Sequence, residues 1–96
     1  MEANSETLEK MSIIIKDEIP KYLSPDFVIW DVKAENRSGP DDEDFVHIRV
    51  ILEDDHPRLD PRKVMEFSSD MHTLFEQIGI GHPPNITYAN RSELSL

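Results

Sequence analysis

The sequence predicts an α+β fold, a two-layer α/β sandwich with the element order α-β-β-α-β. Three observations support this prediction. Two segments place apolar residues three and four positions apart, which is typical of amphipathic helices. Two segments between them alternate apolar and polar residues, which is typical of half-buried strands. The length of 96 residues favours a single domain over residues 1–96.

The first helix is expected from about Glu6 to Ile19. Either Asn4 or Ser5 is suited to cap its start, and Pro20 should end it by removing a backbone donor. One face of this helix carries apolar residues at helical spacing, namely Leu8, Met11, Ile15, Ile19 and Tyr22.

The second helix is expected to start at Asp60-Pro61, an N-cap acceptor followed by proline in the first helical position. Gly79 is the natural left-handed residue after its last turn, with Ile80 folding back. Its apolar stripe consists of Val64, Phe67, Met71, Leu74, Phe75 and Ile78.

Three strands are expected, at residues 27–35, 45–53 and 85–89. The first two should form an antiparallel hairpin in which paired positions sum to 80. This register places Trp30 opposite Val50 on the core face, and Asp31 opposite Arg49 on the other face as an ion pair.

A right-handed crossover after the second helix should make the last strand parallel to the second. The first strand, which carries Trp30 and a long apolar face, is expected in the centre of the three-stranded mixed sheet. Both helices should then cover one face. This layout is loosely ferredoxin-like and resembles the cytosolic domain of cation-diffusion transporters and several other small domains. No motif residue supports a closer link.

The charge balance excludes several classes of partner. The chain has 10 Lys+Arg against 20 Asp+Glu, a net charge of -10. This charge argues against a broad nucleic-acid surface and against binding to an anionic membrane.

The absence of cysteine excludes disulfides and Cys-type zinc sites. The N-terminal residues are acidic and polar, unlike a signal peptide, so a cytoplasmic location is expected.

A run of four carboxylates lies in the predicted hairpin loop, residues 36–44, which we expect to be mobile. The ends of the chain, residues 1–5 and 92–96, are expected to fray. The run lacks the alternate spacing of a calcium loop. It is either a solvated loop or a docking patch for a basic protein partner. Its members are Asp41, Asp42, Glu43 and Asp44.

A weak metal-ligand candidate follows the second strand at Asp54, Asp55 and His56. A fourth ligand would have to come from His47 or His82, and no known ligand spacing is matched. The sequence contains no nucleophile elbow, phosphate loop or dinucleotide fingerprint. No catalytic residue and no cofactor site are therefore predicted.

The sheet face away from the helices is the other candidate surface. Apolar residues among charged ones on such a face are typical of a binding site for a protein partner or for a second copy of the chain, and the sheet edge offers another route. The residues expected to be exposed there include Ile29, Asp31, Phe45, His47, Arg49 and Ile51.

These observations favour a small, acidic, non-enzymatic protein-interaction or regulatory module. One version is an inhibitor or antitoxin-like protein that masks a basic partner, loosely similar to small acidic proteins encoded near bacterial toxin genes. The first alternative is a metal-binding sensory or chaperone-like domain. The second is a small enzyme whose site lies at a dimer cleft.

Overall fold

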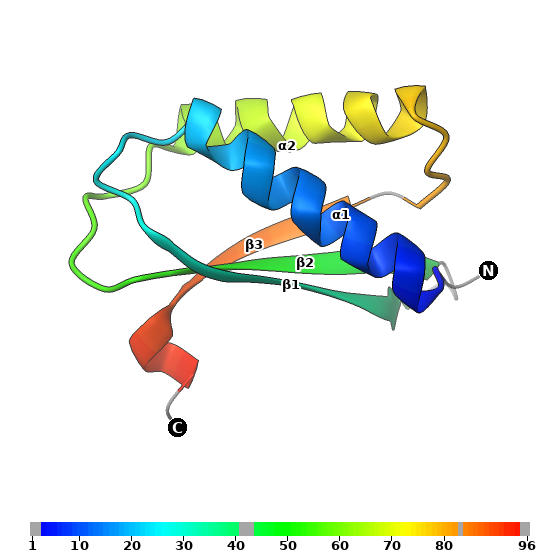
Figure 1. The fold of residues 1–96 in the computed structure, drawn as a ribbon, viewed down its shortest axis with the longest axis horizontal. Coiled ribbons are helices and arrows are strands. Elements are labelled where there is room, and N and C mark those ends of the chain that lie inside the picture. The colour runs from blue at the N-terminus through cyan, green and yellow to red at the C-terminus, as the bar shows by residue number, and fades with distance from the viewer. Residues whose placement is uncertain (1–2, 41–43, 83, 95–96) are drawn as a thin grey trace.

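The computed structural model describes residues 3–40, 44–82 and 84–94. Two helices lie over one face of a three-stranded sheet, and a short 3-10 helix lies below the other face (Figure 1). This arrangement confirms the predicted α+β class and the order α-β-β-α-β. The elements are α1 (Ser5–Glu18), η1 (Ile19–Lys21), β1 (Ile29–Ser38), β2 (Asp44–Leu52), α2 (Pro61–Gln77), β3 (Pro84–Asn90) and η2 (Arg91–Leu94). Within the described residues, neither helix has the length and apolar character needed to cross a membrane.

The strand order is β1-β2-β3, with β1 antiparallel and β3 parallel to β2. The parallel pairing of the last strand with the second is confirmed. The prediction that the first strand is central is wrong, because β2 holds that position. The reason lies in the side chains that the two strands place on the sheet face away from the helices. On β2 that face includes the fully buried Ile51, whereas on β1 it carries Asp31, Lys33, Glu35 and Arg37, which suit an exposed edge.

The register of the hairpin differs from the prediction by two residues. Val32 pairs with Val50 and Lys33 with Arg49, so paired positions sum to 82. At the start of β1 the pairing is irregular: Ile29 pairs with Leu52, a sum of 81, and Asp31 with Ile51, a sum of 82, so Trp30 is the extra residue of a β-bulge. Ile29 therefore packs against the helix-side core, and Trp30 is 40% exposed instead of facing that core.

The core lies between the sheet and the two helices. Even-numbered β2 residues point into it because side chains alternate along a strand. Apolar residues one turn apart on each helix meet them. The residues with 2% exposure or less in this cluster are Met11, Ile15, Ile19, Val46, Ile48, Val50, Leu52, Phe67, Met71 and Phe75.

Local chemistry sets the helix boundaries. Asn4 is the N-cap of α1, since its side chain accepts a hydrogen bond from the Thr7 N–H at 2.8 Å. Asp60 caps α2 in the same way through the Arg62 N–H. Gly79, at φ 82°, ends α2 in a Schellman motif in which Ile80 N–H donates to the Phe75 carbonyl at 2.8 Å.

The two strands of the hairpin extend further toward their connecting loop than predicted, whereas at the other end they begin at Ile29 and end at Leu52, inside the predicted limits of 27 and 53. Strand pairing continues to Ser38 and resumes at Asp44, so only residues 39–43 remain between the strands.

Ala3, expected to fray, is 5% exposed and exchanges two hydrogen bonds with the Asn36 side chain, at 3.0 and 2.7 Å. Near the C-terminus, residues 92–94, which were also expected to fray, belong to the 3-10 helix η2.

A tyrosine joins the turn after α1 to α2. The Tyr22 hydroxyl donates a 2.5 Å hydrogen bond to Asp70, and its ring packs edge-on against Phe67, with centroids 5.0 Å apart. The hydrogen bond to the carboxylate raises the pKa of Tyr22 to about 12. The hydroxyl therefore keeps its proton, and its hydrogen bond to α2, even at pH values above the ordinary tyrosine pKa of 10.

Candidate functional site

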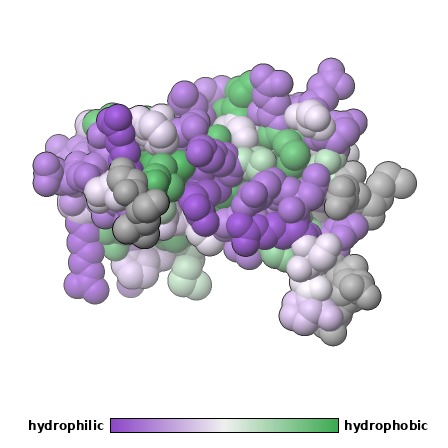
Figure 2. All heavy atoms as spheres, turned by 90° about the horizontal axis from the view of Figure 1, so that it is seen from below, coloured by the Kyte–Doolittle hydropathy of each residue, from purple (hydrophilic) through white to green (hydrophobic). Residues whose placement is uncertain are grey.

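The sheet face opposite the helices is the main candidate site, and we call it the open face. Odd-numbered residues of β2, β3 and, from Asp31 onward, β1 point to it, because paired strands place registered side chains on the same side. Figure 2 views the molecule from this side and shows hydrophilic residues over much of it, with hydrophobic patches between them. Of the helices and strands that the structure describes, only η2, at one end, lies below the sheet (Figure 1).

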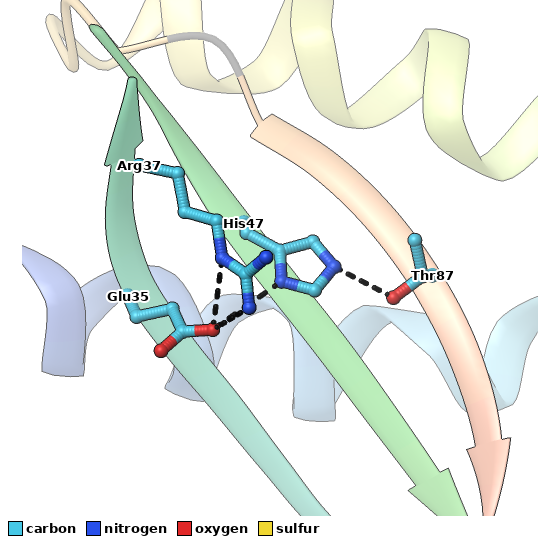
Figure 3. A network of polar contacts seen from close by, with 4 residues as sticks. All are labelled: Glu35, Arg37, His47 and Thr87. Carbon is cyan, nitrogen blue, oxygen red and sulfur yellow. Dashed lines mark hydrogen bonds and ion pairs between the residues drawn. The ribbon is translucent and has the colours of Figure 1, made fainter. Parts of the chain in front are cut away.

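A polar network crosses all three strands of the open face (Figure 3). The His47 ring lies in its centre, with Nε2 2.9 Å from the Thr87 hydroxyl and Nδ1 3.5 Å from Glu35 Oε1. Arg37 donates from Nε and Nη2 to the same Glu35 oxygen, at 3.1 and 2.5 Å. The Arg37 hydrogen bond, followed by that from His47, holds the pKa of Glu35 below its usual value.

The network fixes the orientation of His47, which is 8% exposed. An ionised Glu35 accepts only, so Nδ1 carries the proton when it faces the carboxylate, and Nε2 then accepts from the Thr87 hydroxyl. The sequence placed His47 beside Lys33 on an exposed face. The shifted register places it beside Glu35 instead, and its burial makes it a structural centre of the face.

Next to this network, two cations face each other across the hairpin. Lys33 on β1 pairs directly with Arg49 on β2, so the predicted Asp31–Arg49 ion pair is wrong. Both residues line a hollow of about 410 Å³ together with Ala34 and Glu35. Within the described ranges neither cation has an ion pair, and Glu35 is taken by Arg37 and His47. Like charges opposite each other destabilise a sheet, so this pair favours a bound anionic group.

The Lys33–Arg49 pair gives a prediction for stability. Lys33→Glu should raise the free energy of unfolding by about 0.5 kcal/mol, because it replaces repulsion by an exposed cross-strand ion pair. Lys33→Gln should lie between the native protein and this variant. Urea unfolding at low and high salt measures the effect, which salt should reduce. A Lys33→Glu protein less stable than the native protein would show that the two cations do not repel.

The residues proposed from sequence are partly brought together. Asp31, Phe45, His47, Arg49 and Ile51 belong to the open face by their register. The expectation that Ile51 and Ile29 are exposed is wrong. Ile51 is fully buried, because the bulge sets both Trp30 and Asp31 against it, and Ile29 packs on the opposite, helix-side core. Asp44 begins β2 and accepts a 3.2 Å hydrogen bond from Ser38, while Asp41, Asp42 and Glu43 lie outside the described residues.

The metal-ligand candidates after β2 have other partners. The Asp54 carboxylate accepts from the Ser92 N–H at 3.3 Å, and Asp55 has a left-handed backbone with φ 64°. The His56 ring lies between the Pro57 carbonyl at 2.7 Å and Asn90 Oδ1 at 2.5 Å. In the part of the chain that the structure describes, no three His, Asp or Glu side chains gather in a way that would hold a metal ion.

The contacts of His56 make stability depend on pH. The Pro57 carbonyl, and then Asn90, raise the pKa of His56 above its ordinary value of 6.5. A raised histidine pKa stabilises the fold below the unfolded-state pKa, and this stabilisation is lost as pH rises through the folded-state pKa. We expect the native protein to lose more stability than His56→Gln between pH 5.5 and 8. Equal slopes in urea unfolding would contradict this assignment.

Two groups of polar residues were not identified from the sequence. His72, Glu76 and His82 line one pocket of about 260 Å³ at the end of α2. The spacing of four residues between His72 and Glu76 could have indicated that these two side chains lie on the same face of a helix. A second pocket gathers Lys21, Arg58 and Lys63, which the sequence separates too widely for any spacing rule to connect.

Comparisons with known proteins add a likeness in fold. No family model matches the chain. No curated protein matches it. A solved structure described as that of a zinc transporter, CzrB, in its zinc form is similar, with a TM-score of 0.58 and 15% sequence identity over 97% of each chain. At this identity the likeness concerns the fold alone. The predicted element order also resembles the layout of the cytosolic domain of cation-diffusion transporters, and the two resemblances agree.

Proposed function

We propose that this chain is a non-enzymatic protein-interaction or regulatory module that binds its partner through the open face. The observation that carries the proposal is the Lys33–Arg49 pair, two cations held opposite each other beside a hollow and without an ion pair among the described residues. An acidic side chain of a partner would relieve their repulsion, and an Arg–carboxylate contact adds directionality. The ordered network around His47 gives this contact a rigid base.

The overall charge of the chain supports a second contribution to binding, which is long-range electrostatic attraction of the partner. A net charge of -10 attracts a partner with a basic surface over a distance comparable to the Debye length, about 10 Å at 0.1 M salt. The carboxylates from Asp41 to Asp44, which follow β1 in the sequence, are the densest part of this charge. In this proposal the acidic charge accelerates the encounter, and the open face makes the specific contact. An inhibitor or antitoxin-like protein that masks a basic enzyme would have these properties.

A capture experiment tests the proposal. The immobilised full chain is exposed to lysate at about 50 mM and about 500 mM salt, and bound proteins are identified by mass spectrometry. We expect a stoichiometric protein at low salt that is lost at high salt. Binding should weaken in the triple variant Asp41→Asn, Asp42→Asn, Asp44→Asn. Unchanged capture by the triple variant at low salt would remove the acidic segment from the proposal.

The metal-binding alternative has less support from the described residues. The ring nitrogens of His56 and the carboxylate of Asp54 are engaged in hydrogen bonds. Because the likeness to the zinc transporter concerns the fold alone, it does not bring a metal site to this chain. The interaction proposal, in contrast, uses charges that the register places together.

A further inference from the structure

A second pocket, distant in sequence from the open-face residues, lies between the turn that follows η1 and the segment that leads into α2. Its volume is about 440 Å³. Lys21, Arg58 and Lys63 line it together with Leu23 and Phe27. It shares no lining residue with the hollow at Lys33 and Arg49. The role of this pocket is therefore separable from the proposed protein interaction.

The charge of this pocket is opposite to that of the chain. Three of the ten Lys and Arg residues meet here, although acidic residues are twice as numerous in the sequence. The carboxylate in the pocket wall, Asp60, accepts from the Arg62 N–H as the cap of α2. Lys21 is paired with Glu18 at 2.9 Å, but Arg58 and Lys63 have no ion pair among the residues described. Local charge outweighs distant charge here because salt screens interactions beyond about 8–10 Å.

Most of the remaining wall of the pocket is apolar, with Ser24 as a polar exception. Leu23 and Phe27 also line an adjacent hollow of about 210 Å³, whose other walls include Ile19, Pro25 and Ile29. An anion that binds at Arg58 and Lys63 would thus lie beside a surface suited to an apolar body. Arginine provides a planar donor fork and lysine a compact point charge, a combination that suits a dianionic phosphate.

From this arrangement we propose that the pocket binds a phosphate monoester carried on a small apolar or aromatic body, with the phosphate at Arg58 and Lys63 and the body on Leu23 and Phe27. Ligand pockets generally combine a mostly apolar wall with a few placed polar groups, and this pocket has that composition. The site is independent of the open face, so either proposal can fail without the other.

The test uses the full ¹⁵N-labelled chain and three probes: inorganic phosphate, phenyl phosphate and benzoate. We expect saturable amide shifts around Ser24 and Arg58 with phenyl phosphate, at a dissociation constant near 1 mM or below. Inorganic phosphate should bind more weakly, because it lacks the apolar body. Benzoate should also bind more weakly, because it carries one charge. Absence of saturation with phenyl phosphate, or equal binding of benzoate, would overturn the proposal.

Matched variants locate the binding. Arg58→Gln and Lys63→Gln should each weaken phenyl phosphate binding about fivefold, the upper range for one exposed ion pair. Arg62→Gln removes the same charge from the turn of α2 that carries Lys63, but Arg62 does not line the pocket, so this variant should bind phenyl phosphate as well as the native protein. Equal weakening by Arg62→Gln would mean that phosphate responds only to general charge. Because all three side chains are exposed, the variants should remain folded, which their amide spectra will show.

Discussion

Ile48→Ala is expected to lower the free energy of unfolding by about 3–4 kcal/mol. Ile48 is fully buried on the central strand, where its neighbours in the sheet are Ala34 on β1 and Ile86 on β3. Removing its side chain leaves a cavity that the two sheet neighbours and the overlying helices cannot fill. A domain of this size has a stability of about 5–10 kcal/mol, so the variant loses about 30% or more of it.

Urea unfolding, followed by circular dichroism, measures this loss. Ile13→Ala is the matched control, because Ile13 on α1 is 53% exposed and alanine favours a helix. We expect the control to change stability by less than about 1 kcal/mol. Equal losses in the two variants would contradict the central position of β2 and the location of the core.

Trp30→Ala is expected to cost about 2 kcal/mol, less than the cost of removing a fully buried tryptophan. Trp30 is the extra residue of the bulge and lies on the open face, where the Arg91 guanidinium is 5.0 Å from its ring centroid. The cation–π contact contributes about 0.5–1 kcal/mol of this cost, and the apolar cover over Ile51 contributes the rest.

The single tryptophan of the chain makes this prediction easy to follow by fluorescence. Acrylamide should quench Trp30 substantially, and Arg91→Ala should increase the quenching by uncovering the ring. Arg91 also donates to Glu53 at 3.0 Å, so this variant releases η2 from both contacts. A strongly protected tryptophan, together with a cost above about 3 kcal/mol, would instead place the ring in the helix-side core.

The sequence pattern could predict the faces of the hairpin but not its register. Pairing sums of 80 and 82 both place Val32, Ile48 and Val50 on the core side, because side chains alternate with a period of two. Alternation therefore does not decide between these two registers, and no glycine or proline in β1 indicates the bulge at Trp30. The same bulge reverses the expected positions of Ile29 and Trp30.

The helix ends, in contrast, were predictable because their causes are local. Asn4, Asp60 and Gly79 act through hydrogen bonds or backbone angles within a few residues. The candidate site depends on long-range pairing and was only partly predictable. The Lys33–Arg49 pair follows from the true register, and the pocket of Lys21, Arg58 and Lys63 exists only once the turn after η1 meets the start of α2.

The most direct test of the open-face proposal is the affinity of the captured partner for two double variants. Lys33→Gln with Arg49→Gln neutralises the proposed contact. Lys10→Gln with Arg62→Gln removes the same charge from exposed positions on the helices. We predict that the open-face variant binds about tenfold more weakly than the native protein, while the helix variant binds as well or better. Equal affinities of the two variants would contradict binding through the open face.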